Sequence, residues 1–125
     1  MINKVLLVDD DMPTNFYHKL ILKESKLVKE IVDCISVDEA ITELKSGITP
    51  PDVILLDINM PLKTGWDFLK EYEELATELR ARQVIILSTT KIPSDLERAN
   101  NNPLVSGFLL KPLTNEMIEE IVKNL

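Results

Sequence analysis

Cysteine and histidine are almost absent from this chain, which has one of each among its 125 residues. With Cys34 alone, no intramolecular disulfide can form. Because Cys34 lies in the apolar segment 31–35, we expect a small buried side chain rather than a reactive thiol. The only histidine, His18, lies within a predicted helix among apolar neighbours. We expect it to be packed or at the surface, so mechanisms that need a histidine of this chain lose support.

Long apolar runs and an excess of positive charge are also missing. The longest apolar runs contain only a few residues, whereas a membrane-spanning helix needs about 20. Residues 1–4 lead directly into a strand-like run, without the basic start and apolar stretch of a secretory signal. The 14 basic residues are outnumbered by 21 acidic ones, and the net charge of −7 argues against direct binding of nucleic acid. We expect a soluble, cytoplasmic protein that binds neither nucleic acid nor membranes.

Apolar segments typical of strands alternate five times with segments of helical period. The strand-like segments are nearly continuous in Val, Ile and Leu, which is typical of parallel strands covered on both faces. The predicted strands cover residues 4–9, 30–35, 52–57, 83–88 and 106–110, and the predicted helices cover 13–25, 37–46, 65–79, 94–101 and 115–124. Short right-handed connections then favour an α/β fold, a doubly wound parallel sheet with helices on both faces. With no repeat or linker, we expect one domain over residues 1–125.

Start and stop signals support these helices. Asp11 is a preferred N-cap residue, Pro13 suits the first turn of a helix, and Gly47 suits a left-handed position after one. Three further pairs have the spacing of a capping box: Ser36 with Glu39, Thr64 with Asp67, and Ser94 with Glu97.

Four of the predicted strands end on residues suited to phosphoryl chemistry. The strands run into Asp9 and Asp10, into Asp57, into Ser88, and into Lys111. The carboxyl ends of parallel strands meet at one edge of a sheet, where open α/β sheets bind their ligands. Carboxylates, a hydroxyl and an ammonium gathered there predict a site for a divalent cation and a phosphoryl group.

Three carboxylates are the main basis of this prediction. Asp9, Asp10 and Asp57 would repel one another unless a cation held them, and oxygen ligands suit Mg²⁺ or Mn²⁺. Asp57 is followed by the loop 58–65, which contains a proline and a glycine and leaves the carboxylate accessible. A carboxylate in that setting can act as a nucleophile and form an acyl phosphate. Lys111 would supply a second cation.

At this point the chain resembles the receiver domains of bacterial response regulators, the CheY-like family. The resemblance covers residues 5–125 and is carried by motifs in the same order: Asp9-Asp10, the segment 56–61, Gly65, Ser88, and Lys111-Pro112. It implies a flavodoxin-like (βα)5 fold with strand order 2-1-3-4-5. It also implies a stand-alone signalling switch of a two-component or phosphorelay system.

The resemblance further implies residue roles. Asp57 would receive a phosphoryl group from a histidine of a sensor kinase or a phosphotransfer protein. Mg²⁺ would be bound by Asp10, Asp57 and the backbone carbonyl of Asn59, with Asp9 acting through water. Ser88 and Phe108 would be the switch residues, and the face built from the fourth helix, fifth strand and fifth helix would bind a downstream protein target. The Lys111-Pro112 bond would be cis. Such a domain catalyses only its own phosphorylation and dephosphorylation, so we do not expect an enzyme.

One position departs from the family, and several alternatives stay open. Thr89 follows Ser88 where the family usually has a small residue, and its branched side chain could narrow access to the phosphoryl group. The chain could also be a receiver fragment of a larger regulator. A haloacid-dehalogenase-type phosphatase would need Asp9, Asp11 and then Thr or Val, but Pro13 occupies the last place. A flavin-binding module would need a Ser/Thr/Gly-rich phosphate loop that the acidic run lacks. A receiver fold that is not phosphorylated is disfavoured by the completeness of the site.

Overall fold

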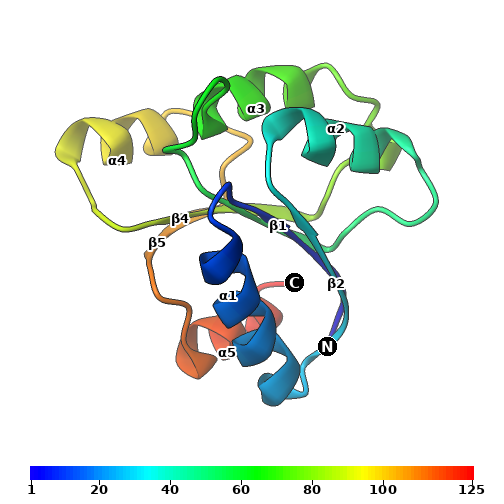
Figure 1. Cartoon of the computed structure of the whole chain (residues 1–125). Coiled ribbons are helices and arrows are strands. Elements are labelled where there is room, and N and C mark those ends of the chain that lie inside the picture. Colours follow the sequence, from blue (N-terminus) through cyan, green and yellow to red (C-terminus); the bar gives the residue numbers. More distant parts are fainter.

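The predicted apolar segments form the strands of one parallel sheet in the computed structural model, which describes all residues from 1 to 125 (Figure 1). The strand order is β2-β1-β3-β4-β5, which confirms the expected flavodoxin-like topology. The strands are β1 (Ile2–Val8), β2 (Val28–Cys34), β3 (Val53–Leu56), β4 (Gln83–Ser88) and β5 (Gly107–Leu110). The helices are α1 (Met12–Ser25), α2 (Val37–Lys45), α3 (Gly65–Glu73), α4 (Pro93–Asn100) and α5 (Asn115–Lys123), with a short 3₁₀ turn at Thr77–Leu79.

The helices cover both faces of the sheet. In Figure 1, α2, α3 and α4 lie on one side of the strands, and α1 and α5 lie on the other. Successive residues of a strand point to opposite faces, so Leu6 belongs to the core under α2 and α3, and Leu7 belongs to the core under α1 and α5. This two-sided burial is the reason that the strands are apolar throughout. None of the helices combines the length and the apolar character needed to cross a membrane.

The register of the sheet brings the strand ends to the same level. Val8 at the end of β1 is paired with Leu56 at the end of β3, and Leu56 is paired with Ile86 of β4. The residues that follow these strands, Asp9 and Asp57, are therefore neighbours at the carboxyl edge. The backbone N–H of Asp57 donates a hydrogen bond to the Val8 carbonyl at 2.9 Å.

Most helix starts follow the sequence signals, and one does not. The side chain of Asp11 accepts a hydrogen bond from Thr14 at the start of α1. The expected side-chain caps form at α2, where Ser36 accepts from Glu39, and at α3, where Thr64 and Asp67 form a full capping box. The predicted cap at Ser94 is wrong: α4 begins at Pro93 after Ile92 and has no side-chain cap. Proline lacks an N–H and has a helical φ, which starts this helix one residue early and places Ser94 inside the first turn.

The single helix predicted over 65–79 is also wrong. The α-helix ends at Glu73, and Ala76 has an extended backbone before the 3₁₀ turn. The Arg80 side chain donates hydrogen bonds to the carbonyls of Glu73 and Leu75, which the ended helix leaves without partners. Leu75 is buried in the core at this bend. Other boundaries differ from the predicted ones by one or two residues.

Gly65 allows the start of α3 to pack closely against the loop that follows Asp57. A Cβ at this position would lie 2.7 Å from the Asp57 carbonyl oxygen and 2.7 Å from the Ile58 Cα. The Gly65 N–H also donates to the Ile58 carbonyl at 3.1 Å. Both obstacles are backbone atoms that cannot rotate away, so the loop and helix can meet in this way only without a side chain.

We expect Gly65→Ala to lower the free energy of unfolding by about 1–3 kcal/mol, because the added methyl group overpacks rigid backbone. Urea unfolding measures the change. Gly107→Ala is the matched control, since its Cβ would meet only Ile85 side-chain atoms at 3.9 Å. That control should be neutral or stabilising by less than about 1 kcal/mol. Equal stability of the two variants would contradict the proposed close contact.

Candidate functional site

Three carboxylates meet at the carboxyl edge of the sheet. Asp9 and Asp10 follow β1 and Asp57 follows β3, and oxygen atoms from all three lie within 4.8 Å of one another. Asp9 and Asp57 are buried, at 5% and 7% exposure, whereas Asp10 is exposed. The predicted acidic cluster is therefore assembled by the fold, with one member open to solvent.

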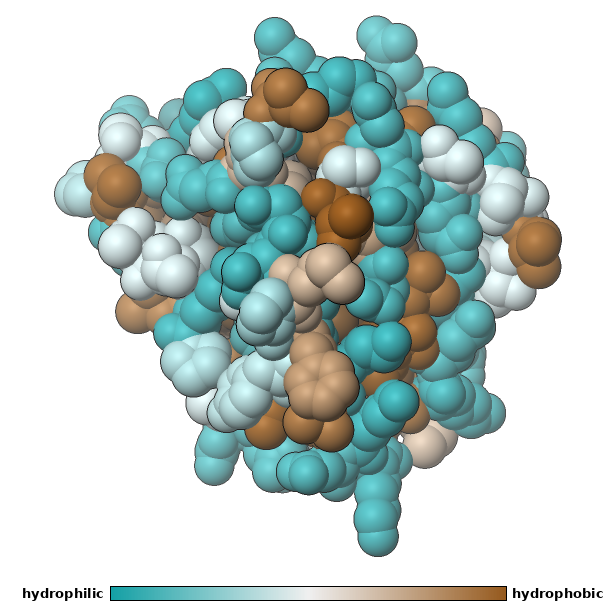
Figure 2. Space-filling model, viewed as in Figure 1, coloured by the Kyte–Doolittle hydropathy of each residue, from teal (hydrophilic) through white to brown (hydrophobic).

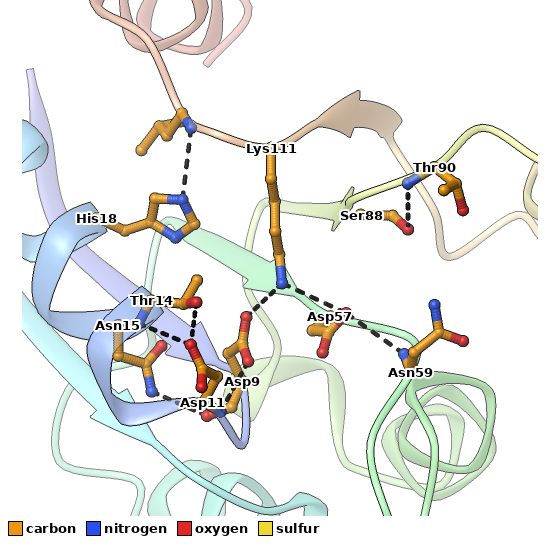
Figure 3. Close-up of polar contacts among 11 residues, drawn as sticks. Asp9, Asp11, Thr14, Asn15, His18, Asp57, Asn59, Ser88, Thr90 and Lys111 are labelled. Atoms are coloured by element: carbon orange, nitrogen blue, oxygen red, sulfur yellow. Dashed lines mark hydrogen bonds and ion pairs between the residues drawn. The ribbon is translucent and has the colours of Figure 1, made fainter.

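Lys111 provides the one ammonium that touches this cluster. It follows β5 and extends back across the edge, so that its Nζ lies 2.6 Å from Asp9 Oδ2 and 3.6 Å from Asp57 Oδ1 (Figure 3). One positive charge against three carboxylates leaves the site negative. The donor set, which consists of carboxylate oxygens with one open side, fits a hard divalent cation such as Mg²⁺.

The pKa of the Asp57 carboxyl is set by opposing effects of its surroundings. Burial raises the pKa of the Asp57 carboxyl above its ordinary value, and the negative charges of Asp9 and Asp10 add to the increase. Lys111 and the backbone N–H of Asn59, which donates to Asp57 Oδ1 at 3.3 Å, lower the same pKa. The net direction is upward, so ionised Asp57 is held at a cost in folding free energy.

Asp9 is fixed by its own neighbours. Its Oδ1 accepts a hydrogen bond from the Asp11 N–H at 2.9 Å, and its carbonyl accepts one from Asn15 Nδ2 at 2.8 Å. The sequence analysis missed Asn15. The available signal was helical spacing, because Asn15, His18 and Leu22 are the three buried residues of α1.

Of the two expected switch residues, Ser88 ends β4 and Phe108 lies in β5. Ser88 is fully buried, its Oγ accepts a hydrogen bond from the Thr90 N–H at 3.4 Å, and it makes no hydrogen bond to Asp57. Phe108 is half-buried and packs against a small cluster of Ile58, Ile86 and Ala99. Phe108 therefore contacts a group that includes both the residue after Asp57 and a residue of α4.

The remaining sequence predictions near the site have clear outcomes. Cys34 is buried, and burial raises the pKa of its thiol to about 12, so it is an inert core residue as expected. His18 is buried, which is one of the two environments expected for it. The Lys111-Pro112 bond is cis. The Asp11 carboxylate is occupied by Thr14 at the start of α1, which removes it from the role that a dehalogenase-type phosphatase would need.

Comparison with known proteins agrees with this geometry. Residues 5–123 match the sequence profile of the response regulator receiver domain. The chain belongs to this family. Solved structures extend the match: a two-component response regulator from Cytophaga hutchinsonii has a TM-score of 0.89 and 29% identity, covering 98% of this chain and 96% of that one. A response regulator receiver protein from Dyadobacter fermentans has a TM-score of 0.86 and 30% identity, covering 97% and 95%.

Curated relatives of the receiver domain are longer proteins. The probable methanogenesis regulatory protein FilR2 of Methanothrix harundinacea is 33% identical over 79 residues, which cover 63% of this chain and 50% of FilR2. The sensory transduction protein LytT of Bacillus anthracis is 28% identical over 120 residues, which cover 96% of this chain and 46% of LytT. The chain thus spans about half the length of these relatives.

We expect Asp57→Asn to raise the free energy of unfolding at pH 7 without divalent cations. Because the folded pKa of Asp57 lies above its unfolded value, the cost of its ionisation is present in full above the folded pKa and vanishes below the ordinary carboxyl range. The difference in the free energy of unfolding between the variant and the wild type should therefore shrink as the pH falls. Urea unfolding at several pH values measures it, with the exposed Glu119→Gln as control. A less stable Asp57→Asn variant at pH 7 would show that burial does not dominate.

Proposed function

We propose that this receiver domain accepts a phosphoryl group on the Asp57 carboxylate from a phosphohistidine of a sensor kinase or phosphotransfer protein. One observation carries the proposal: the buried Asp57 carboxylate faces Lys111 and lies within 4.8 Å of two further carboxylates at the edge where ligands bind. A carboxylate that served only to end a strand would need neither partner. Family membership supports the same reading.

In the proposed transfer, an Asp57 carboxylate oxygen attacks phosphorus and the P–N bond to the donor imidazole breaks. The electron pair of that bond goes to the imidazole nitrogen. The donor side chain is released as neutral histidine, with one proton on its ring, and Asp57 becomes an acyl phosphate. Lys111 is placed to neutralise charge on the phosphoryl oxygens and to keep Asp57 ionised. The domain acts on its own side chain, so we propose a switch rather than an enzyme with a separate substrate.

The residues that would hold Mg²⁺ or Mn²⁺ are Asp10, Asp57 and the backbone carbonyl of Asn59, with Asp9 acting through water. The negative excess of the cluster supports this assignment, because Lys111 balances only one of three carboxylates. When bound, the cation supplies charge neutralisation for the transferring phosphoryl group. Asp10, as the exposed member, leaves the approach open.

The donor would approach beside α1. Thr89, Tyr17 and Lys111 line a groove of about 430 Å³ between this helix and the β5–α5 connection. Apolar side chains are exposed on α1, and Figure 2 shows brown residues over the centre of the face where α1 lies in Figure 1. These exposed side chains are Met12, Phe16, Tyr17 and Leu20. Thr89 lines the groove, where its branched side chain would narrow access to the phosphoryl group.

Output would pass through Ser88 and Phe108. Turning Ser88 Oγ toward a phosphoryl oxygen would weaken the hydrogen bond that it accepts from the Thr90 N–H at 3.4 Å, and the β4–α4 connection would then be free to shift. Phe108 packs against the cluster that contains Ile58 and Ala99 of α4, so we propose that a change beside Asp57 reaches α4 through this cluster. We propose that the face formed by α4, β5 and α5 is remodelled in this way and binds a downstream protein.

Incubation with acetyl phosphate and Mg²⁺ tests the phosphorylation. Intact mass should show the gain of one phosphoryl group on the wild type and on Glu119→Gln, and no gain on Asp57→Asn or with a chelator present. A gain that persists in Asp57→Asn would move the acceptor elsewhere. No gain on the wild type would overturn the proposed function.

Mg²⁺ should also stabilise the unphosphorylated protein, because it binds only the folded state. At about 100 times its Kd the free energy of unfolding should rise by about 2.7 kcal/mol. Thermal unfolding with and without Mg²⁺ measures this effect. Asp10→Asn should lose most of it and Glu119→Gln should keep it. A similar gain in both variants would place the cation outside the acidic cluster.

A further inference from the structure

The buried side of α1 carries two polar residues where an ordinary amphipathic helix would have apolar ones. Asn15, His18 and Leu22 are its buried residues, and His18 is only 2% exposed. Asn15 Nδ2 donates to the Asp9 carbonyl, and Asn15 Oδ1 is buried without a hydrogen-bond partner. His18 has no part in the chemistry proposed above. Burying an imidazole is unfavourable unless it finds a hydrogen-bond partner.

The partner of His18 lies in the segment that carries Lys111. The backbone N–H of Leu113 donates to His18 Nε2 at 3.4 Å (Figure 3). Leu113 is 1% exposed and its N–H makes no other hydrogen bond within the chain, so His18 is its only protein acceptor. A buried N–H without an acceptor would cost folding free energy.

This contact is the second of two backbone hydrogen bonds that hold the segment around Lys111. The Lys111 N–H donates to the Ser88 carbonyl of β4 at 2.7 Å. Pro112 has no N–H, so the next backbone donor is that of Leu113, which binds α1 through His18. The backbone around Lys111 is therefore tied to β4 before the cis bond and to α1 after it. The first tie continues the parallel pairing of β4 with β5, whereas the second joins this segment to a helix on one face of the sheet.

Placement matters because the Lys111 side chain must cross the edge of the sheet. Its Nζ makes its short contact with Asp9 Oδ2 at 2.6 Å and its longer one with Asp57 Oδ1 at 3.6 Å. A shift of about 1 Å in the backbone of Lys111 would change the position from which its side chain reaches both carboxylates, and misplacements of that size slow reactions markedly. Burial and the charge of Lys111 lower the pKa of His18, and the charge of Asp9 raises it; the net direction is downward, which favours the neutral imidazole that can accept a hydrogen bond.

We propose that His18 is a positioning residue for the phosphorylation reaction: by accepting the Leu113 N–H from α1, it holds Lys111 over Asp9 and Asp57. The inference rests on the proposed function of Asp57 and extends it to a residue outside the acidic cluster. Its chemical requirement is a hydrogen-bond acceptor of sufficient reach, not a histidine as such.

Three variants separate positioning from packing. His18→Leu fills the space but removes the acceptor. His18→Gln keeps an acceptor of similar reach. Leu22→Ala disturbs the same buried side of α1 one turn away and removes no polar contact. If His18→Leu does not fold, His18→Asn replaces it, since its shorter side chain withdraws the acceptor while remaining polar.

The first measurement is the phosphorylation rate with acetyl phosphate and saturating Mg²⁺. We expect His18→Leu to be slowed threefold to tenfold, the range that loss of one hydrogen bond gives. His18→Gln should recover most of the rate, and Leu22→Ala should react like the wild type while being less stable. A wild-type rate for His18→Leu, an equal slowing in Leu22→Ala, or no recovery in a folded His18→Gln would overturn the proposal.

The second measurement needs no phosphorylation. In amide NMR spectra of the unphosphorylated protein, His18→Leu should shift the Leu113 and Lys111 resonances, and His18→Gln should return them toward the wild type. Unmoved Lys111 resonances would overturn the positioning role. If the wild type takes up no phosphoryl group, the proposed function fails, and this measurement still decides whether His18 places Lys111.

Discussion

Like-charge repulsion at the carboxyl edge of the sheet is the constraint on which the rest of the site depends. Parallel pairing of β1 with β3 forces Asp9 and Asp57 to be neighbours, and Asp10 joins them. Two of the three carboxylates are buried, where their mutual repulsion is poorly screened. The ammonium of Lys111 offsets one charge, and the remaining negative charge is what the proposed divalent cation would balance. The apolar layers on both faces keep this arrangement in place, because the strands cannot separate without exposing the core.

The surroundings of the cluster divide into held and movable parts. Asp9 is held by backbone and side-chain bonds from the start of α1, and the loop after Asp57 is pressed against α3 at Gly65. Ser88 by contrast has a single long hydrogen bond to the next loop, and Phe108 is only half-buried. The carboxylate Asp9 thus has more hydrogen bonds to hold it than the Ser88 hydroxyl has, which agrees with the proposed roles of Ser88 and Phe108 as the residues that respond to phosphorylation.

The errors of the sequence analysis have physical causes. The helix predicted over 65–79 breaks after Glu73 because Leu75 turns into the core and Arg80 binds the released carbonyls, neither of which a periodic pattern reveals. The cap predicted at Ser94 failed because Pro93 begins the helix without one. Both errors lie where a local signal competed with a contact or a backbone restriction that overrode it. Neither displaced a residue of the acidic cluster.

The sequence by itself determined the succession of strands and helices along the chain, the family motifs, and the meeting of Asp9, Asp10 and Asp57 at one edge of the sheet. These depend on local apolar pattern and on the rule that parallel strands end together, both readable along the chain. Only the tertiary structure decided the distances from Lys111 to each carboxylate, the burial of Ser88, and the contact of His18 with Leu113. Those depend on packing between segments as far apart as His18 and Leu113, for which no local sequence signal exists.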